Sequence, residues 1–142
     1  RLYFTAMRFI RRAFDDHSFN DNPKLDTPQL LKMWHFINQI ELIADLIKLI
    51  AYLLNKKYSK KIDLKHFFDS LSTIQKLYID SMKAFYKSDA EEAYALANLK
   101  DDLIKKNEDL CENYKDKDLC IMFERLNFLI LDIHRITRRI YS

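Results

Sequence analysis

The run Glu41-Leu42-Ile43-Ala44-Asp45 decides the fold of this chain, and it lies within the longer stretch from Trp34 to Tyr58. Its two acids stand four residues apart, so an α-helix places both carboxylates on one face, where like charges cost about 0.2 to 0.5 kcal/mol. We therefore expect a cation opposite them. From Leu42 to Leu54 only Asp45 and Lys48 are charged, so little of this helix can remain in water. We expect it to be the central helix of a bundle.

The composition around this run is that of an all-α protein. A chain of 142 residues is long enough for one domain with a real core. It contains no Gly and two Pro, which leaves almost nothing to build the turns of an all-β fold. The charged fraction of 32% with a net charge of +3 indicates a solvated surface of mixed sign, and is too weakly basic to argue for nucleic-acid binding.

The chain carries no feature typical of a secreted or membrane protein. No signal peptide is recognised, and the longest apolar run is too short and too charged to span a bilayer. We expect a cytoplasmic protein. The first residue is Arg1 rather than Met, and a helical pattern begins at once, so we expect a truncated product that lacks its earlier elements.

The two cysteines, Cys111 and Cys120, stand nine residues apart with no His nearby in sequence. This spacing satisfies no zinc motif, and the pair is expected to flank a turn. We expect free thiols, as is usual inside cells. A disulfide across a helical hairpin stays open as the alternative, because the interiors of hyperthermophiles are an exception to that rule.

Hydrophobic periodicity predicts five amphipathic helices, over residues 1–14, 28–58, 64–87, 90–113 and 119–140, with a loop from about 15 to 27. Thr27 with Pro28 is a start signal for the second helix, and Asp63 and Asp118 are predicted caps of the third and fifth. Ser88 or Asp89 should break and recap the chain. Short later connections imply antiparallel neighbours in an elongated bundle.

An internal repeat relates the two halves. Setting Glu41–Asp45 over Phe128–Asp132 aligns two helices at an offset of 87 residues, and helix one then corresponds to helix four. The sequence therefore predicts three-helix repeats, with the first helix of repeat one absent. Residues 1–61 form the remainder of repeat one and residues 62–142 form repeat two, within a single domain.

These motifs resemble the PhoU family of phosphate-uptake regulators. Gln39 to Asp45, followed by Leu46 to Ala51, is similar to the family's third-helix signature of Glu, Arg, a spacer and Asp. The second-helix signature is matched by Asp89-Ala90-Glu91-Glu92-Ala93 and by Asn98-x-x-x-Asp102, in the same order along the chain. The resemblance covers essentially all 142 residues and is closest to the archaeal branch. The chain departs from the pattern at Asn98 and Phe128, where the family has acids.

The resemblance implies an all-α bundle of PhoU-like repeats without catalysis of its own. Family members regulate phosphate uptake through contacts with the ATPase of a phosphate ABC transporter or with a sensor kinase. For this chain the resemblance implies the same partners, a homodimer, attachment to the membrane only through a partner, and no direct contact with nucleic acid.

The resemblance also implies a divalent or iron-type metal ion, held by the carboxylates of Glu41, Asp45, Asp102 and Asp132. Carboxylates at i and i+4 on adjacent helices make an oxygen-rich cage suited to such a cation. The competing interpretation is a set of ion pairs. Lys48 or Arg8 could pair with the first two acids, and Arg135, Arg125 or Arg139 with the last one. The lone histidines His35, His66 and His134 are expected at the surface or the core boundary.

Three other functions compete. A di-iron enzyme on a helical bundle would need Glu-x-x-His pairs, and none occurs. A dimerisation or scaffold domain of a transcriptional regulator would use the stripe from Leu119 to Ile140, or the second helix, as its interface. Arg135, Arg138 and Arg139 suggest contact with acidic lipid or nucleic acid, but they are few. The non-enzymatic regulator is the function we expect.

Overall fold

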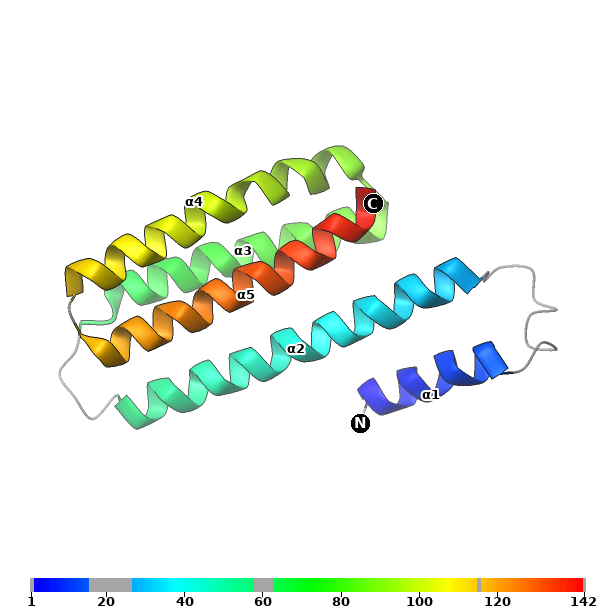
Figure 1. The fold of residues 1–142 in the computed structure, drawn as a ribbon, viewed down its shortest axis with the longest axis horizontal. Coiled ribbons are helices and arrows are strands. Elements are labelled where there is room, and N and C mark those ends of the chain that lie inside the picture. Colours follow the sequence, from blue (N-terminus) through cyan, green and yellow to red (C-terminus); the bar gives the residue numbers. More distant parts are fainter. Residues whose placement is uncertain (1, 16–26, 58–62, 115, 142) are drawn as a thin grey trace. The chain divides into compact units, whose positions relative to one another are not determined.

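The computed structural model describes residues 2–15, 27–57, 63–114 and 116–141, and these residues form α-helices with short connections and no strand (Figure 1). The helices are α1 Leu2–Asp15, α2 Thr27–Lys57, α3 Lys65–Lys87, α4 Ala90–Tyr114 and α5 Lys117–Tyr141. The all-α prediction is confirmed, and each described helix end lies within two residues of its predicted place. The predicted loop between the first two helices lies outside the described residues, apart from its ends.

The chain divides into two compact units, residues 1–42 and residues 43–142, so the boundary falls inside α2. In the first unit, α1 lies antiparallel to the beginning of α2 (Figure 1). The Tyr3 hydroxyl donates a hydrogen bond of 2.7 Å to the Asn38 side-chain oxygen. Ile10 and Ala13, three residues apart, form the buried part of α1. This spacing places both on one face of a short amphipathic helix.

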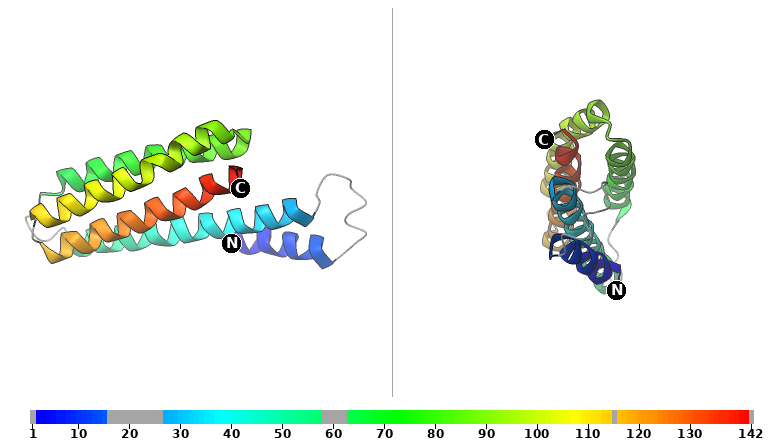
Figure 2. Two further views of the ribbon diagram at one scale, coloured as in Figure 1. Left: turned by 45° about the horizontal axis from the view of Figure 1, so that its top comes forward. Right: turned by 90° about the vertical axis from the view of Figure 1, so that its right-hand side faces the viewer.

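In the second unit, α3, α4 and α5 form a three-helix arrangement in which each helix contacts the other two (Figure 2). The predicted stripe of α5 from Leu119 to Ile136 is buried throughout. Phe123, Ile130 and Thr137, outside that stripe, are buried as well. Within this unit the contacts of α5, with α3 and with α4, are the most extensive. The central place of the second helix stays a prediction. An apolar sequence shows what a helix can bury, but the number of its neighbours decides what it does bury.

The turn between α3 and α4 is built as predicted. Ser88 closes α3 in the left-handed conformation with φ of 53°, and its N–H donates to the carbonyl of Phe85. The Asp89 carboxylate then accepts a 3.0 Å hydrogen bond from the N–H of Glu92, as expected of an N-cap three residues ahead. Among the described residues, Ser88 is the one with positive φ, at a helix end where glycine is the usual residue.

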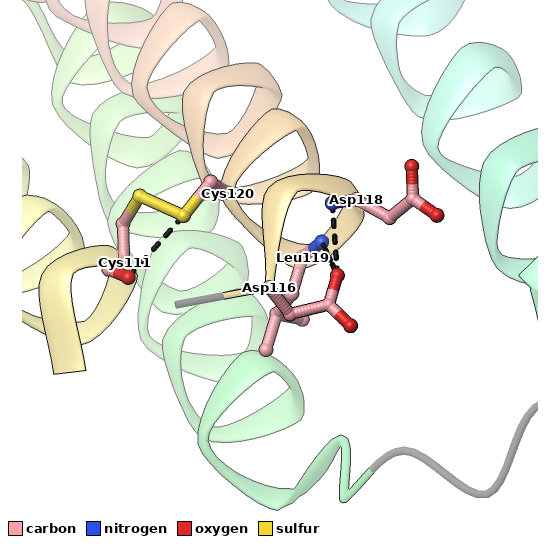
Figure 3. The surroundings of a disulfide bond; sticks show 5 residues. All are labelled: Cys111, Asp116, Asp118, Leu119 and Cys120. Atoms are coloured by element: carbon pink, nitrogen blue, oxygen red, sulfur yellow. Dashed lines mark hydrogen bonds between the residues drawn. A yellow bond between two sulfur atoms is a disulfide. The ribbon is translucent and has the colours of Figure 1, made fainter. Parts of the chain in front are cut away.

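The start of α5 differs from the prediction. Asp116, rather than Asp118, accepts hydrogen bonds from the backbone N–H groups of Asp118 and Leu119, at 2.8 and 3.0 Å (Figure 3). Asp118 lies in the first turn, where an acid is favoured by the helix dipole. The prediction failed because two acids stand two residues apart and each can cap. Asp63, the predicted cap of α3, accepts the N–H of Lys65 at 2.9 Å, but the N-cap position itself is occupied by Leu64, which has no side-chain capping hydrogen bond.

The buried faces of α3 and α4 contain small and polar residues as well as large apolar ones. In α3 the buried residues alternate in spacings of three and four: Phe67, Ser70, Ile74, Leu77, Ser81 and Ala84. In α4 they are Ala93, Leu96 and Asn107. The apolar residues Phe68 and Leu99 of the same helices are 45% and 47% exposed, so hydropathy alone does not identify the buried face.

Candidate functional site

The predicted acids of α2 lie on one helix but in different surroundings. Asp45 is exposed, and its carboxylate pairs with the Lys48 ammonium at 2.8 Å, one turn along the helix. Glu41 is half-buried. The ion-pair interpretation is thus confirmed for Asp45 and Lys48. Because both side chains are more than half exposed, this pair contributes little to stability, within about 0 to 1 kcal/mol.

Asp132 is the buried one of the four predicted acids. Its side chain is 10% exposed, and its carboxylate accepts a 2.6 Å hydrogen bond from the guanidinium of Arg135. The predicted ion pair is therefore confirmed here as well. The guanidinium of Arg125 lies over the Phe128 ring at 5.6 Å, a cation–π contact. Phe128, the counterpart of Glu41 at the offset of 87 residues, thus stands beside a cation.

The structure does not gather the predicted acids into a metal cage. Asp102 is exposed on α4, and Asp45 and Asp132 each carry a basic partner. Within residues 2–15, 27–57, 63–114 and 116–141, no three His, Cys, Asp or Glu side chains stand close enough to hold one ion. A hard cation needs several oxygen ligands, so these residues as placed do not fit a metal centre.

The candidate site is defined by comparing the exposure of α2 with that of α5, the two helices that the sequence repeat aligns. Leu42 and Leu49 are 49% and 38% exposed, whereas their counterparts 87 residues later, Leu129 and Ile136, are 3% and 0% exposed. Tyr52, on the same side of α2 as Leu49, is 62% exposed. We call Leu42, Asp45, Leu49 and Tyr52 the α2 face, since spacings of three and four place them on one side of the helix.

The α2 face is an exposed surface of mixed character. Its apolar side chains are Leu42 before Asp45 and Leu49 and Tyr52 after it, and the Asp45 carboxylate pairs with Lys48 between them. The sequence predicted that little of this helix remains in water, because only Asp45 and Lys48 are charged between Leu42 and Leu54. Exposure, which the sequence does not contain, is what separates a docking face from a core face.

A buried polar pair inside the second unit was not predicted. The amide of Asn107 on α4 donates to the side-chain oxygen of Asn127 on α5 at 2.8 Å. Asn107 is 2% exposed, and the hydroxyl of Ser70 on α3 is buried beside it with no hydrogen-bond partner. The sequence contains a signal for this burial, because Asn107 lies a whole number of helical turns after Leu96 and therefore on the same side of α4 as Ala93 and Leu96. Such pairs favour one register of the helices over others.

The cysteines form a disulfide, which corrects the prediction of free thiols. Cys111 near the end of α4 and Cys120 near the start of α5 are joined across the turn, with their Cα atoms 4.8 Å apart (Figure 3). The Cys120 sulfur also lies 3.2 Å from the Cys111 carbonyl oxygen. This is a close contact rather than a hydrogen bond, because a disulfide sulfur carries no hydrogen. The hairpin-disulfide alternative is the one that the structure adopts.

Of the histidines, His134 has a shifted pKa. Burial lowers the pKa of this imidazole below its ordinary value, and the nearby cations Lys100 and Arg138 lower it further, while Asp101 opposes them. His134 is half-buried, in agreement with the predicted place at the core boundary. Lowering of the pKa favours the neutral ring at physiological pH.

Comparisons with known proteins give this chain no relative: no family model, no curated protein and no solved structure matches it. None of the described helices combines the length and the apolar character that crossing a bilayer requires.

Proposed function

We propose that this chain is a non-enzymatic regulator of phosphate uptake or phosphate signalling, which acts by protein contact in the manner of the PhoU family. Its partner is the ATPase of a phosphate ABC transporter or a sensor kinase. The observation that carries the proposal is the exposure of the α2 face, at positions whose counterparts in α5 are core. An apolar helix face of this kind is stabilised when a partner covers it.

Two further features support the proposal. The run from Glu41 to Asp45, on which the family resemblance rests, is continuous with the α2 face. The order of the helices is also the order that the resemblance implies, with α3, α4 and α5 as a complete three-helix set.

Metal binding is a separate part of the proposal and does not enter the mechanism, because the placed carboxylates do not fit a cage. It is tested by measuring the metal content of the purified protein and of the Glu41→Gln, Asp45→Asn double variant. Loss of a stoichiometric divalent or iron-type ion in the variant would support the predicted ligands. Equal metal content in both proteins would rule them out.

A cytoplasmic location is part of the proposal, since the proposed partners use ATP on the cytoplasmic side. The disulfide bears directly on this point, because disulfides are rare in the cytosol of mesophiles but occur inside hyperthermophiles. Alkylation of free thiols in freshly lysed native cells tests it. A protein found fully reduced would show that the disulfide does not form at that location.

The direct test is affinity capture from native lysates of phosphate-starved and phosphate-replete cells. Three baits are compared: the wild type, Leu49→Glu on the α2 face, and Ile79→Glu, which changes a residue of similar exposure, 43%, on α3. We expect a phosphate-transporter ATPase or a histidine kinase with the wild type and the Ile79 variant, and not with the Leu49 variant. Recovery of no such protein, or equal recovery by all three baits, would contradict the proposal.

A second candidate is a helical dimerisation or scaffold domain of a transcriptional regulator or of another transporter-linked protein. The apolar side chains of α1 favour it, since Phe4 and Phe9 are 66% and 48% exposed. In that case the α2 face would be covered by another part of the same assembly. The capture experiment separates the two candidates, because a scaffold would return its own assembly in both phosphate conditions.

A further inference from the structure

The first unit contains an open groove between α1 and α2, apart from the α2 face. The cavity in it has a volume of about 360 Å³, within the range of about 300 to 1,000 Å³ typical of binding pockets. Its walls are apolar, formed by Phe4, Met7 and Phe14 of α1 and by Trp34 of α2. Phe4, Phe14 and Trp34 are 66%, 36% and 38% exposed, so rings line a space that is open to a ligand.

The groove is also positively charged. Arg8 and Arg11 both line it and stand one turn apart on α1. Arg11 pairs with Asp15 at 3.8 Å, but both side chains are more than 70% exposed, so water screens that pair strongly. Over its whole length α1 has three arginines and one acid. The groove therefore suits a large apolar side chain that is flanked by carboxylates.

The chain itself carries a surface of this chemistry on α4. Tyr94 is 61% exposed, and Glu91 lies one turn before it on the same side of the helix. Asp101, seven residues after Tyr94, continues that side. Its side chain is 86% exposed, so water screens the 3.0 Å pair that its carboxylate makes with the Lys100 ammonium. The whole of α4 has seven acidic and three basic residues, the opposite balance to α1. Tyr94 with its flanking acids thus complements the groove in apolar character and in charge.

We propose that the α1–α2 groove of one copy of this chain receives the α4 surface of a second copy. Tyr94 enters the cavity between Phe4 and Trp34, and the carboxylates of Glu91 and Asp101 meet the guanidiniums of Arg8 and Arg11. Tyr suits such a contact, because its ring is buried while its hydroxyl can stay at the wet edge. Each copy carries one groove and one α4 surface, so the contact joins two unlike surfaces and is heterologous in kind.

This inference is independent of the proposed phosphate function, and a charge-swap experiment on the full chain tests it. One variant reverses the groove, Arg8→Glu with Arg11→Glu. The other reverses the α4 surface, Glu91→Arg with Asp101→Arg. In a mixture of these two variants, the reversed groove of one meets the reversed α4 surface of the other, so the charges across the contact are opposite again. The control, Lys65→Glu with Lys76→Glu, makes the same change of charge on α3.

Association is measured by analytical ultracentrifugation over a range of concentrations in low salt, after circular dichroism has confirmed equal helix content. We expect the wild type and the control to self-associate and each reversed variant to do so at least tenfold more weakly. An equimolar mixture of the two reversed variants should regain the wild-type affinity. A monomeric wild type, unchanged association of both variants, or no recovery in the mixture would overturn the proposal.

Trp34 provides a second readout that does not depend on charge, because it is the one tryptophan of the sequence and lines the groove. Burial of its ring by a second copy should move its fluorescence to shorter wavelength as the protein concentration rises. The Tyr94→Ala variant, altered at an exposed position, should lose that shift. An equal shift in the wild type and in this variant would show that Tyr94 does not occupy the groove.

Discussion

Two helices of this protein, α2 and α5, have similar sequence patterns and different surroundings. At an offset of 87 residues, three pairs of positions are buried in both helices: Gln39 and Leu126, Ile43 and Ile130, and Ile50 and Thr137. Further pairs, among them Leu129 with Leu42 and Ile136 with Leu49, are buried in α5 alone. Leu129 and Ile136 are core residues, whereas Leu42 and Leu49 are largely exposed. One side of each helix therefore follows the repeat, and a second side does not.

The difference shows that an apolar stripe has two possible uses. In α5 the stripe is wide because both α3 and α4 contact this helix. In α2 the same residue types leave apolar surface in water, which is unfavourable by about 25 cal/mol for each Å² that a partner could cover. Exposed apolar surface of this kind is stabilised when a partner covers it. The following experiments test this contrast at matched positions.

The largest effect is expected from removing a side chain from the core of α5. Leu129→Ala should lower the free energy of unfolding by about 2 to 5 kcal/mol, because it leaves a cavity where Leu129 is 3% exposed. Its counterpart Leu42→Ala should change it by about 0.5 kcal/mol or less. Urea unfolding followed by circular dichroism measures both. Similar losses in the two variants would mean that Leu42 is a core residue in solution.

The next largest effect on stability is expected from removing the disulfide, which joins α4 to α5 across their turn. Both cysteines of the sequence lie in the second unit, so no equivalent bond can hold α1 to α2. The double variant Cys111→Ala with Cys120→Ala should lose about 2 to 3 kcal/mol, the entropy of closing a loop of this length in the unfolded chain. Thermal unfolding with and without a reducing agent checks this. A wild type that is insensitive to reduction would contradict it.

A smaller contrast is expected between the two ion pairs related by the repeat. Asp132→Asn should cost about 1 to 2 kcal/mol, because it weakens a buried hydrogen bond to a charged group. Asp45→Asn should cost under about 0.5 kcal/mol, since its pair with Lys48 is exposed. High salt should reduce the second value further and leave most of the first. Equal costs in chemical unfolding would remove the distinction between buried and exposed pairs.

The smallest effect is expected in the pH dependence of stability, to which His134 of α5 contributes. The pKa of His134 is lowered in the folded state, so the unfolded chain binds more protons just below pH 6.5. Stability from this residue should therefore fall as the pH falls through that range, and be fully present above it. His134→Gln should unfold with a flatter pH dependence than the wild type between pH 5.5 and 7.5. The counterpart of His134 in α2 is Ile47, which cannot titrate.

The helices themselves followed from the sequence because their signals are local. The stop at Ser88 and the cap at Asp89 depend on side chains within four residues of the groups that they satisfy. The ion pairs Asp45–Lys48 and Asp132–Arg135 join residues one turn apart on a single helix, so their spacing predicted them too. The cap of α5 was misassigned to Asp118 because two neighbouring acids offer the same local chemistry.

The candidate site was harder to predict, because it depends on which helix faces are covered. In sequence, Leu42 and Leu49 cannot be told apart from Leu129 and Ile136, because all four are apolar residues in helical periodicity. The metal prediction likewise assumed that acids on different helices would meet. The buried Asn107–Asn127 pair was missed because hydropathy treats asparagine as a surface residue. Its burial is tolerated because each amide supplies the hydrogen-bond partner that the other needs.

The sequence by itself determined the number of helices, their ends and the short-range ion pairs, since these depend on periodicity and on groups within one helical turn. Tertiary structure alone decided which residues of α5 are buried against α3 and α4, that Cys111 and Cys120 are joined, and that the α2 face stays exposed. The physical reason is that burial is a property of neighbours. An apolar side chain contributes to stability only when another element removes its surface from water.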